Sequence, residues 1–174
     1  MTARAAIVTV SDRASRGEYE DKGGPAAEAW LGGVVTSPLS ITRDIIPDGR
    51  ASVAATLRRL VAEGADLILV TGGTGPAPRD ETPEGVADVV EKELAGFGEE
   101  MRRASLREVP TAILSRQSAG IAGKSLIITL PGKPAAIATC LDAVFAAVPY
   151  CLDLIGAGRI DTDPARIKAF RPKA

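Results

Sequence analysis

The sequence predicts an α/β fold, a three-layer sandwich in which a mostly parallel sheet lies between helices. Two observations carry this prediction. Short apolar, β-branched runs alternate along the chain with longer segments whose apolar residues recur at helical spacing. Several runs are apolar throughout, which is typical of parallel strands covered on both faces. We expect a single domain over residues 1–174, with 156–174 as a C-terminal tail or an edge-covering segment.

Each element is expected from its local pattern. Strands are predicted at residues 5–10, 41–46, 67–71 and 126–130, and 111–114 is either a short strand or a loop. Helices are predicted from Pro25 toward Leu31, over about 51–63, around Val86, over 97–104, and along one continuous apolar face at 137–148.

The stretch 66–84 organises the rest of the chain. Its strand runs directly into TGGTG at 71–75, and glycine lets backbone N–H groups turn toward a phosphate that approaches without meeting a Cβ. Asp80 then adds a carboxylate. Thr82 is expected to cap a new helix through its hydroxyl, with Pro83 at the first helical position and Glu84 facing the helix dipole.

Loops that follow parallel strands meet at one edge of the sheet, where ligands collect. The predicted loops carry Ser11, Asp12, Asp48, Asp80, Gly132 and Lys133. Hydroxyl, amide and lysine groups suit phosphate oxygens, and two carboxylates suit a hydrated magnesium ion beside them. This combination of phosphate-binding groups and carboxylates indicates a site for nucleotide chemistry. Ordinary roles remain open, because the loop after residue 10 can be a solvated connection and Asp48 can be a helix cap.

Composition argues against several classes of function. A formal charge of −1, with 3% aromatic residues, gives neither the field nor the stacking platforms of nucleic-acid binders. The absence of histidine excludes a Ser-His-Asp triad and the usual zinc clusters, so Cys140 and Cys151 are expected to be buried thiols. The first ten residues do not resemble a secretory signal and no run of eighteen apolar residues occurs, so we expect a cytoplasmic protein without a membrane span.

The sequence does not match two familiar nucleotide-binding motifs, the Walker A loop and the dinucleotide fingerprint. GIAGKS at 120–125 resembles the end of a Walker A loop, but Ser118 stands where the first glycine belongs and a strand follows, so we interpret it as a turn. Gly73 and Gly75 have the opening spacing of a dinucleotide fingerprint, but Pro78 occupies the third glycine position. A Rossmann dehydrogenase is therefore not predicted.

Four motifs resemble the MogA-type molybdopterin adenylyltransferases, which belong with MoaB and the gephyrin G domain. They are SDRAS at 11–15, IPD at 46–48, TGGTG with RDETPE at 71–84, and LPGKP at 130–134. Shorter matches extend the resemblance over nearly the whole chain: DKG at 21–23, PTAILSRQ at 110–117, VPYC at 148–151 and FRPK at 170–173. SDRAS and FRPK favour the MogA type over the MoaB type, which shares the reaction.

The resemblance implies a MogA/MoaB-like fold and the magnesium-dependent adenylylation of molybdopterin by ATP, with pyrophosphate released. It also implies a homotrimer and a molybdenum insertase as a possible partner. The two functionally important aspartates of the family fall on Asp48 and Asp80, which are the expected catalytic residues, and Asp48 is the expected magnesium ligand. The expected binding residues are Ser11, Asp12, Gly72, Gly73, Thr74, Gly75, Pro131, Gly132, Lys133 and Pro134.

A different function remains open at this point. Gephyrin joins a related domain to a scaffolding role, so the chain could instead be a non-catalytic module that binds molybdopterin. The intact pair Asp48 and Asp80 argues against an inactive site. Arg116 and Gln117 match the family motif, but their roles do not follow from the sequence.

Overall fold

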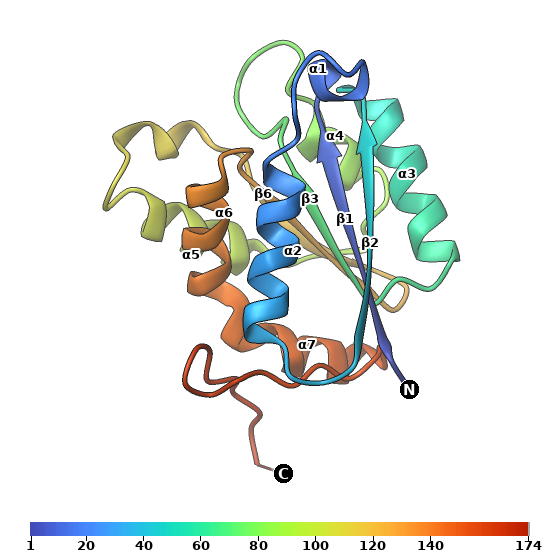
Figure 1. The fold of residues 1–174 in the computed structure, drawn as a ribbon, viewed down its shortest axis with the longest axis vertical. Coiled ribbons are helices and arrows are strands. Elements are labelled where there is room, and N and C mark those ends of the chain that lie inside the picture. The colour runs from blue at the N-terminus through green and yellow to red at the C-terminus, as the bar shows by residue number, and fades with distance from the viewer. Residues whose placement is uncertain (174) are drawn as a thin grey trace.

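A computed structural model describes residues 1–173 and confirms the predicted α/β fold. The six strands of its sheet are arranged in the order β2-β1-β3-β6-β5-β4 (Figure 1). The first four pair in parallel, and β5 and β4 add an antiparallel edge. The strands are β1 (Ala3–Val10), β2 (Leu39–Ile46), β3 (Leu67–Thr71), β4 (Lys92–Glu93), β5 (Ala119–Ala122) and β6 (Ser125–Leu130).

Helices cover both faces of the sheet (Figure 1). One face carries α2 (Gly23–Val34), α5 (Ala95–Ser105), α6 (Pro134–Val144) and α7 (Val148–Ile155). The other face carries α3 (Arg50–Ala62) and α4 (Thr82–Ala87). Three short pieces complete the chain: α1 (Asp12–Ser15) and the 3₁₀ turns η1 (Pro110–Leu114) and η2 (Phe145–Ala147).

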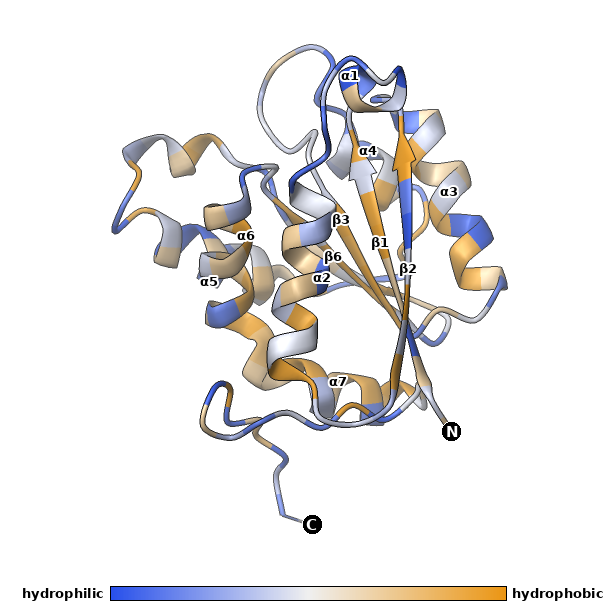
Figure 2. Cartoon of the chain, viewed as in Figure 1, coloured by the Kyte–Doolittle hydropathy of each residue, from blue (hydrophilic) through white to orange (hydrophobic). Residues whose placement is uncertain are grey.

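Two apolar cores result from the alternation of side chains along each strand. Ala5 and Ile7 of β1 point into the core under α2 and α6, whereas Ala6 and Val8 point into the core under α3. The central strands are therefore apolar on both faces (Figure 2), which explains why they read as unbroken hydrophobic runs.

The turn expected within 120–125 is confirmed, because Gly123 and Lys124 join β5 to β6 in a hairpin. Two local expectations need correction. The segment 111–114, expected to be a strand or a loop, belongs to the 3₁₀ turn η1. The continuous helix expected at 137–148 is broken at η2. Pro149 stands at the start of α7 and has no N–H to donate back across the break, which accounts for it.

The 22 residues Pro134–Ile155 are long and apolar enough to cross a membrane by length and composition alone. Their apolar character has another explanation, because Ile137, Leu141, Phe145 and Leu152 are all buried in the core. A buried core helix of a globular protein can have the same length and apolar composition as a membrane span.

Residues 157–173 form a covering segment that follows α7. Ile160 and Ile167 are buried in the core, and Thr162 forms an isolated bridge with Val35. The Gly158 N–H donates to the Asp66 carboxylate at 2.6 Å. The segment thus covers the end of the sheet opposite the carboxyl ends of the strands (Figure 1).

Candidate functional site

The carboxyl ends of the four parallel strands lie level with one another. Val10 pairs with Ile46, and Thr71 pairs with both Thr9 and Leu130. The chain runs from β1 outward to β2 and then returns to β3 on the other side of β1. This reversal leaves a crevice between β1 and β3, the place where ligands bind in open α/β sheets.

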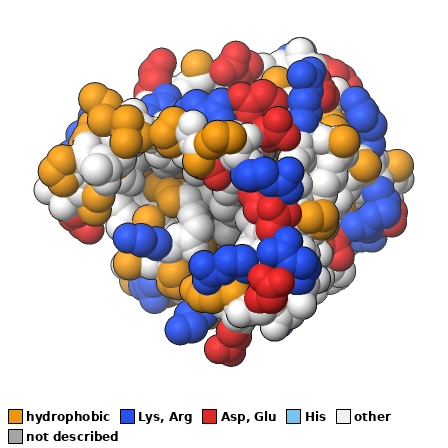
Figure 3. All heavy atoms as spheres, turned by 90° about the horizontal axis from the view of Figure 1, so that it is seen from above, with side chains coloured by type: hydrophobic (Ala, Val, Ile, Leu, Met, Phe, Trp, Pro, Cys, Tyr) orange, Lys and Arg blue, Asp and Glu red, His pale blue; other side chains and the backbone are white. Residues whose placement is uncertain are grey.

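A cavity of about 340 Å³ occupies this crevice, and we call it the strand-end cavity. Seen from above, the face is hollowed, and charged side chains of both signs line one side of the hollow (Figure 3). Five of the predicted binding residues are brought together here: Ser11, Gly72, Gly132, Lys133 and Pro134. The rest of the lining is Thr9, Val10, Ala14, Tyr19, Asp21, Lys22, Gly23 and Thr71.

Two helices begin at this cavity. Lys22 and Gly23 open α2, and Lys133 and Pro134 open α6. Helix N-termini carry unpaired N–H groups and a partial positive charge, so this arrangement favours an anion such as phosphate. Asp21 is already engaged, since its carboxylate accepts the Gly24 N–H at 3.1 Å and the Thr9 hydroxyl at 2.8 Å.

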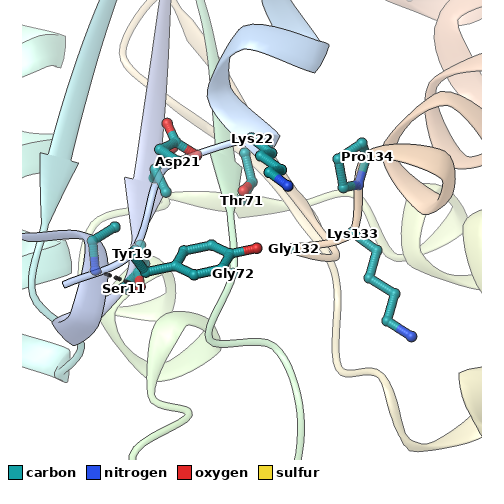
Figure 4. A pocket seen from close by; sticks show the side chains of 13 residues that line it. Ser11, Tyr19, Asp21, Lys22, Thr71, Gly72, Gly132, Lys133 and Pro134 are labelled. Carbon is teal, nitrogen blue, oxygen red and sulfur yellow. Dashed lines mark hydrogen bonds between the residues drawn. The ribbon is translucent and has the colours of Figure 1, made fainter. Parts of the chain in front are cut away.

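Side chains on the cavity wall differ in direction. Figure 4 shows the Tyr19 ring extending toward Gly132, whereas the Lys133 side chain extends away from it. Lys22 and Lys133 are the two cationic residues of the lining, and each stands at the start of a helix.

The glycine turn, residues 72–75, depends on glycine for steric reasons. Gly72 and Gly73 have φ angles of +93° and +65°. A Cβ on Gly72 would lie 2.4 Å from the Val10 carbonyl oxygen, far inside contact distance. The Gly72 N–H donates to the Leu130 carbonyl, whereas the N–H groups of residues 73–75 donate to no partner among residues 1–173. These three amides have no hydrogen-bond partner within the described residues, although residues 73–75 do not line the strand-end cavity.

Thr82 does not have the capping role expected of it. The N-cap of α4 is Glu81, and Pro83 is the second helical residue. The Thr82 hydroxyl instead donates to the Gly72 carbonyl at 2.8 Å, and its N–H donates to the Gly73 carbonyl at 3.1 Å. Thr82 is fully buried, and its two hydrogen bonds connect the glycine turn to the start of α4.

Asp12 and Asp48 form a reciprocal pair that joins the loops after β1 and β2. The Asp12 N–H donates to Asp48 Oδ2 at 2.8 Å, and the Asp48 N–H donates to Asp12 Oδ1 at 3.1 Å. Arg79 adds a bidentate contact to the Asp12 carboxylate at 2.8–3.0 Å. Its hydrogen bonds hold the pKa of Asp12 below the ordinary value. The side chains therefore fix loop positions as well as carrying charge.

These residues do not form a preassembled metal cage. Among the described residues, no group of three or more His, Cys, Asp or Glu side chains is placed to hold a metal ion. Both Asp12 oxygens are engaged by Arg79, but Asp48 Oδ1 accepts no hydrogen bond within residues 1–173 and faces Gly73. A magnesium ion that keeps several waters and binds through one carboxylate and substrate phosphates fits this donor set.

Asp80 lies apart from the strand-end cavity. Its Oδ2 accepts the Ala77 N–H at 3.1 Å and approaches Gly75, so the carboxylate faces its own loop. Thr74 is buried, and its carbonyl accepts the Arg116 N–H at 2.7 Å. Neither side chain lines the cavity in this structure. Asp48 and Asp80 both flank the glycine turn, from different sides.

A second cavity of about 270 Å³ shares Gly132 and Lys133 with the first and is also lined by Pro131, and we call it the side cavity. Its inner end contains buried Gln117, whose amide donates to the Cys140 thiol at 3.2 Å. Cys140 is buried as predicted, and burial raises the pKa of its thiol. Cys151 is only partly buried, which corrects the expectation for that residue.

Five polar side chains of the strand-end cavity were not predicted from the sequence. Thr9 and Thr71 lie inside strands, where their hydroxyls could not be distinguished from ordinary β-branched residues. Tyr19, Asp21 and Lys22 lie in the long polar loop before α2. The DKG motif at 21–23 was the available signal, because a charged pair directly before a helix start places its groups at that helix N-terminus.

The family model described as "Probable molybdopterin binding domain" matches residues 6–150. This chain belongs to that family. The molybdopterin adenylyltransferase of Helicobacter pylori is 50% identical over 173 residues, which cover 99% of this chain and 98% of the relative. The molybdopterin adenylyltransferase of Escherichia coli K12 is 46% identical, covering 99% of this chain and 95% of the relative.

Solved structures of the family have the same fold. The molybdopterin biosynthesis enzyme MoaB from Thermus thermophilus superposes with a TM-score of 0.81 at 40% identity, covering 88% of this chain and 96% of that one. A MogA structure gives a TM-score of 0.82 at 37% identity, covering 87% of this chain and 99% of that one. The predicted family and fold are thereby confirmed.

Proposed function

We propose that this chain is a molybdopterin adenylyltransferase of molybdenum cofactor biosynthesis. The observation that carries the proposal is its 46–50% identity, over nearly its whole length, to relatives that bear this name. The site supports it, because the two cavities share Gly132 and Lys133 before α6, and the first is also lined by Lys22 at the start of α2. Two phosphate-bearing substrates need such neutralisation before they can approach each other.

In the reaction, a terminal phosphate oxygen of molybdopterin attacks the α-phosphorus of ATP. One P–O bond forms to that oxygen, the bond to the β-phosphate bridge breaks, and pyrophosphate leaves. The chain needs chiefly to bind and align two polyanions. The amides of the glycine turn, the N-termini of α2 and α6, and the Lys22 ammonium are the groups available for this purpose.

Asp48 is the residue we assign to magnesium, through its free Oδ1 beside the glycine turn. The ion would supply positive charge between phosphate oxygens as negative charge develops on pyrophosphate. Asp80 is assigned to orienting ATP or the pterin. Because it flanks the turn on the α4 side, it acts next to whichever group the turn holds.

Incubation with molybdopterin, labelled ATP and magnesium tests the proposal. An adenylylated pterin and an equal amount of pyrophosphate are expected. Asp48→Asn should lose at least about 100-fold in rate, whereas Asp44→Asn, on the exposed edge strand β2, should not. Folded protein that binds molybdopterin in calorimetry without releasing pyrophosphate would instead establish the carrier or scaffold function.

We further propose a cytoplasmic homotrimer that delivers its product to a molybdenum insertase. An exposed apolar surface next to the hollow supports assembly, and it consists of Leu106, Val109, Ile113 and Leu114. Sedimentation equilibrium tests the trimer directly, and a monomer mass at micromolar concentration would contradict it.

A further inference from the structure

Residues 75–80 form a loop, which we call the 75–80 loop, with few hydrogen bonds of its own. It contains no helix or strand, and Pro76 and Pro78 have no N–H to donate. Two internal hydrogen bonds remain in it: the Asp80 N–H donates to the Ala77 carbonyl at 2.9 Å, and the Ala77 N–H donates to Asp80 Oδ2 at 3.1 Å. Something outside the loop must fix its ends.

Arg116, between η1 and β5, contacts both ends of this loop. Its Nε donates to the Gly75 carbonyl at 3.1 Å, and its Nη2 donates to the Asp80 carbonyl at 2.5 Å. Its own backbone N–H donates to the Thr74 carbonyl at 2.7 Å. One residue thus binds three carbonyls along residues 74–80.

The remaining guanidinium nitrogen holds Arg116 in place. Nη1 donates to Glu84 Oε1 in the first turn of α4, and this contact holds the pKa of Glu84 below its ordinary value. Three different nitrogens therefore bind three acceptors, on Gly75, Asp80 and Glu84. A lysine ammonium has the charge but not the planar fork needed to reach all three.

We propose that Arg116 is a positioning residue that clasps the 75–80 loop and thereby sets the place of Asp80 in the reaction. The inference rests on the proposed function, because it assigns a consequence to the role of Asp80 there. All three guanidinium nitrogens of Arg116 are engaged by the loop and by α4, and Arg116 lines neither the strand-end cavity nor the side cavity, so we assign it a role that acts through the loop. Displacing a reacting group by about 1 Å can cost roughly 100-fold in rate.

The test combines Arg116→Lys, Asp80→Asn and the double variant in the adenylyl-transfer assay. Arg116→Lys should lower kcat roughly 10- to 100-fold with KM for molybdopterin nearly unchanged. In the Asp80→Asn background, the same change should lower kcat by about twofold or less, because the residue through which Arg116 acts is already altered. Arg103→Lys is the control, since Arg103 pairs with Glu100 on the exposed side of α5.

Amide hydrogen exchange provides a readout that does not depend on activity. Peptides covering residues 74–84 should exchange faster in Arg116→Lys than in the wild type, while the sheet stays protected. Glu84→Gln, which keeps the side chain but loses the charge, should have a smaller effect of the same kind.

Each outcome decides a different point. Wild-type kcat in Arg116→Lys, or an equal loss in both Asp80 backgrounds, would overturn the positioning role. Amide hydrogen exchange over residues 74–84 that is the same in Arg116→Lys as in the wild type would contradict the proposal that Arg116 holds the 75–80 loop. If the wild-type protein forms no adenylylated pterin, the proposed function fails, and the exchange experiment still decides whether Arg116 holds the loop.

Discussion

Replacing Gly72 with alanine is expected to destabilise the protein by about 2–5 kcal/mol. Gly72 directly follows β3 and has a φ of +93°, where a Cβ costs about 1–2 kcal/mol. The new Cβ would also lie 2.4 Å from the Val10 carbonyl oxygen, which belongs to a paired strand and cannot move freely. Overpacking of this kind adds about 1–3 kcal/mol.

Urea unfolding followed by tryptophan fluorescence and circular dichroism measures this loss. Gly17→Ala is the matched control, because Gly17 also has a positive φ, +72°, but a Cβ there meets nothing within 4 Å. The control should lose only the conformational part, about 1–2 kcal/mol. The difference between the two variants therefore isolates the clash with Val10.

Equal losses in Gly72→Ala and Gly17→Ala would refute this reasoning. Such a result would mean that the ends of β1 and β3 can separate at little cost. The crevice between them would then be adaptable, and the argument that glycine is required for the shape of the strand-end cavity would fail.

Two further predictions concern the core and the loop. Phe145→Ala removes a fully buried ring and should cost about 3–5 kcal/mol in urea unfolding, whereas Leu154→Ala, 68% exposed, should change stability by less than about 0.5 kcal/mol. The pKa of Glu84 is lowered by Arg116, so the stability it contributes is present above its ordinary value of 4.5 and is lost as pH falls through the lower folded-state value. The difference in unfolding free energy between wild type and Glu84→Gln should therefore shrink below that pH, and a constant difference down to about pH 3 would contradict the assignment.

Secondary structure could be predicted where burial of one face makes apolar residues recur at the spacing of a helix or a strand. The central strands and the faces of α3 and α6 could be predicted because each residue there is selected for one side of a layer. The short strands β4 and β5 were missed. The edge strand β4 has two exposed residues and no apolar alternation to detect, and β5 is only four residues long. The break at η2 was missed because its apolar face continues across it and only Pro149 marks it.

The sequence by itself determined the fold class, the positions of the strand ends and the glycine turn. It also determined the family, through motifs that each lie within a few residues. These features are local, so a periodic pattern or a steric requirement at one position is enough to reveal them.

Only the tertiary structure decided what the polar side chains bind. Arg79 reaches Asp12 across 67 positions, and Arg116 reaches Asp80 across 36. Thr82 binds the Gly72 carbonyl instead of capping its own helix. Partners so far apart in the chain meet because the fold brings the segments that carry them to one edge of the sheet. No local pattern of residues predicts which donor binds which acceptor there.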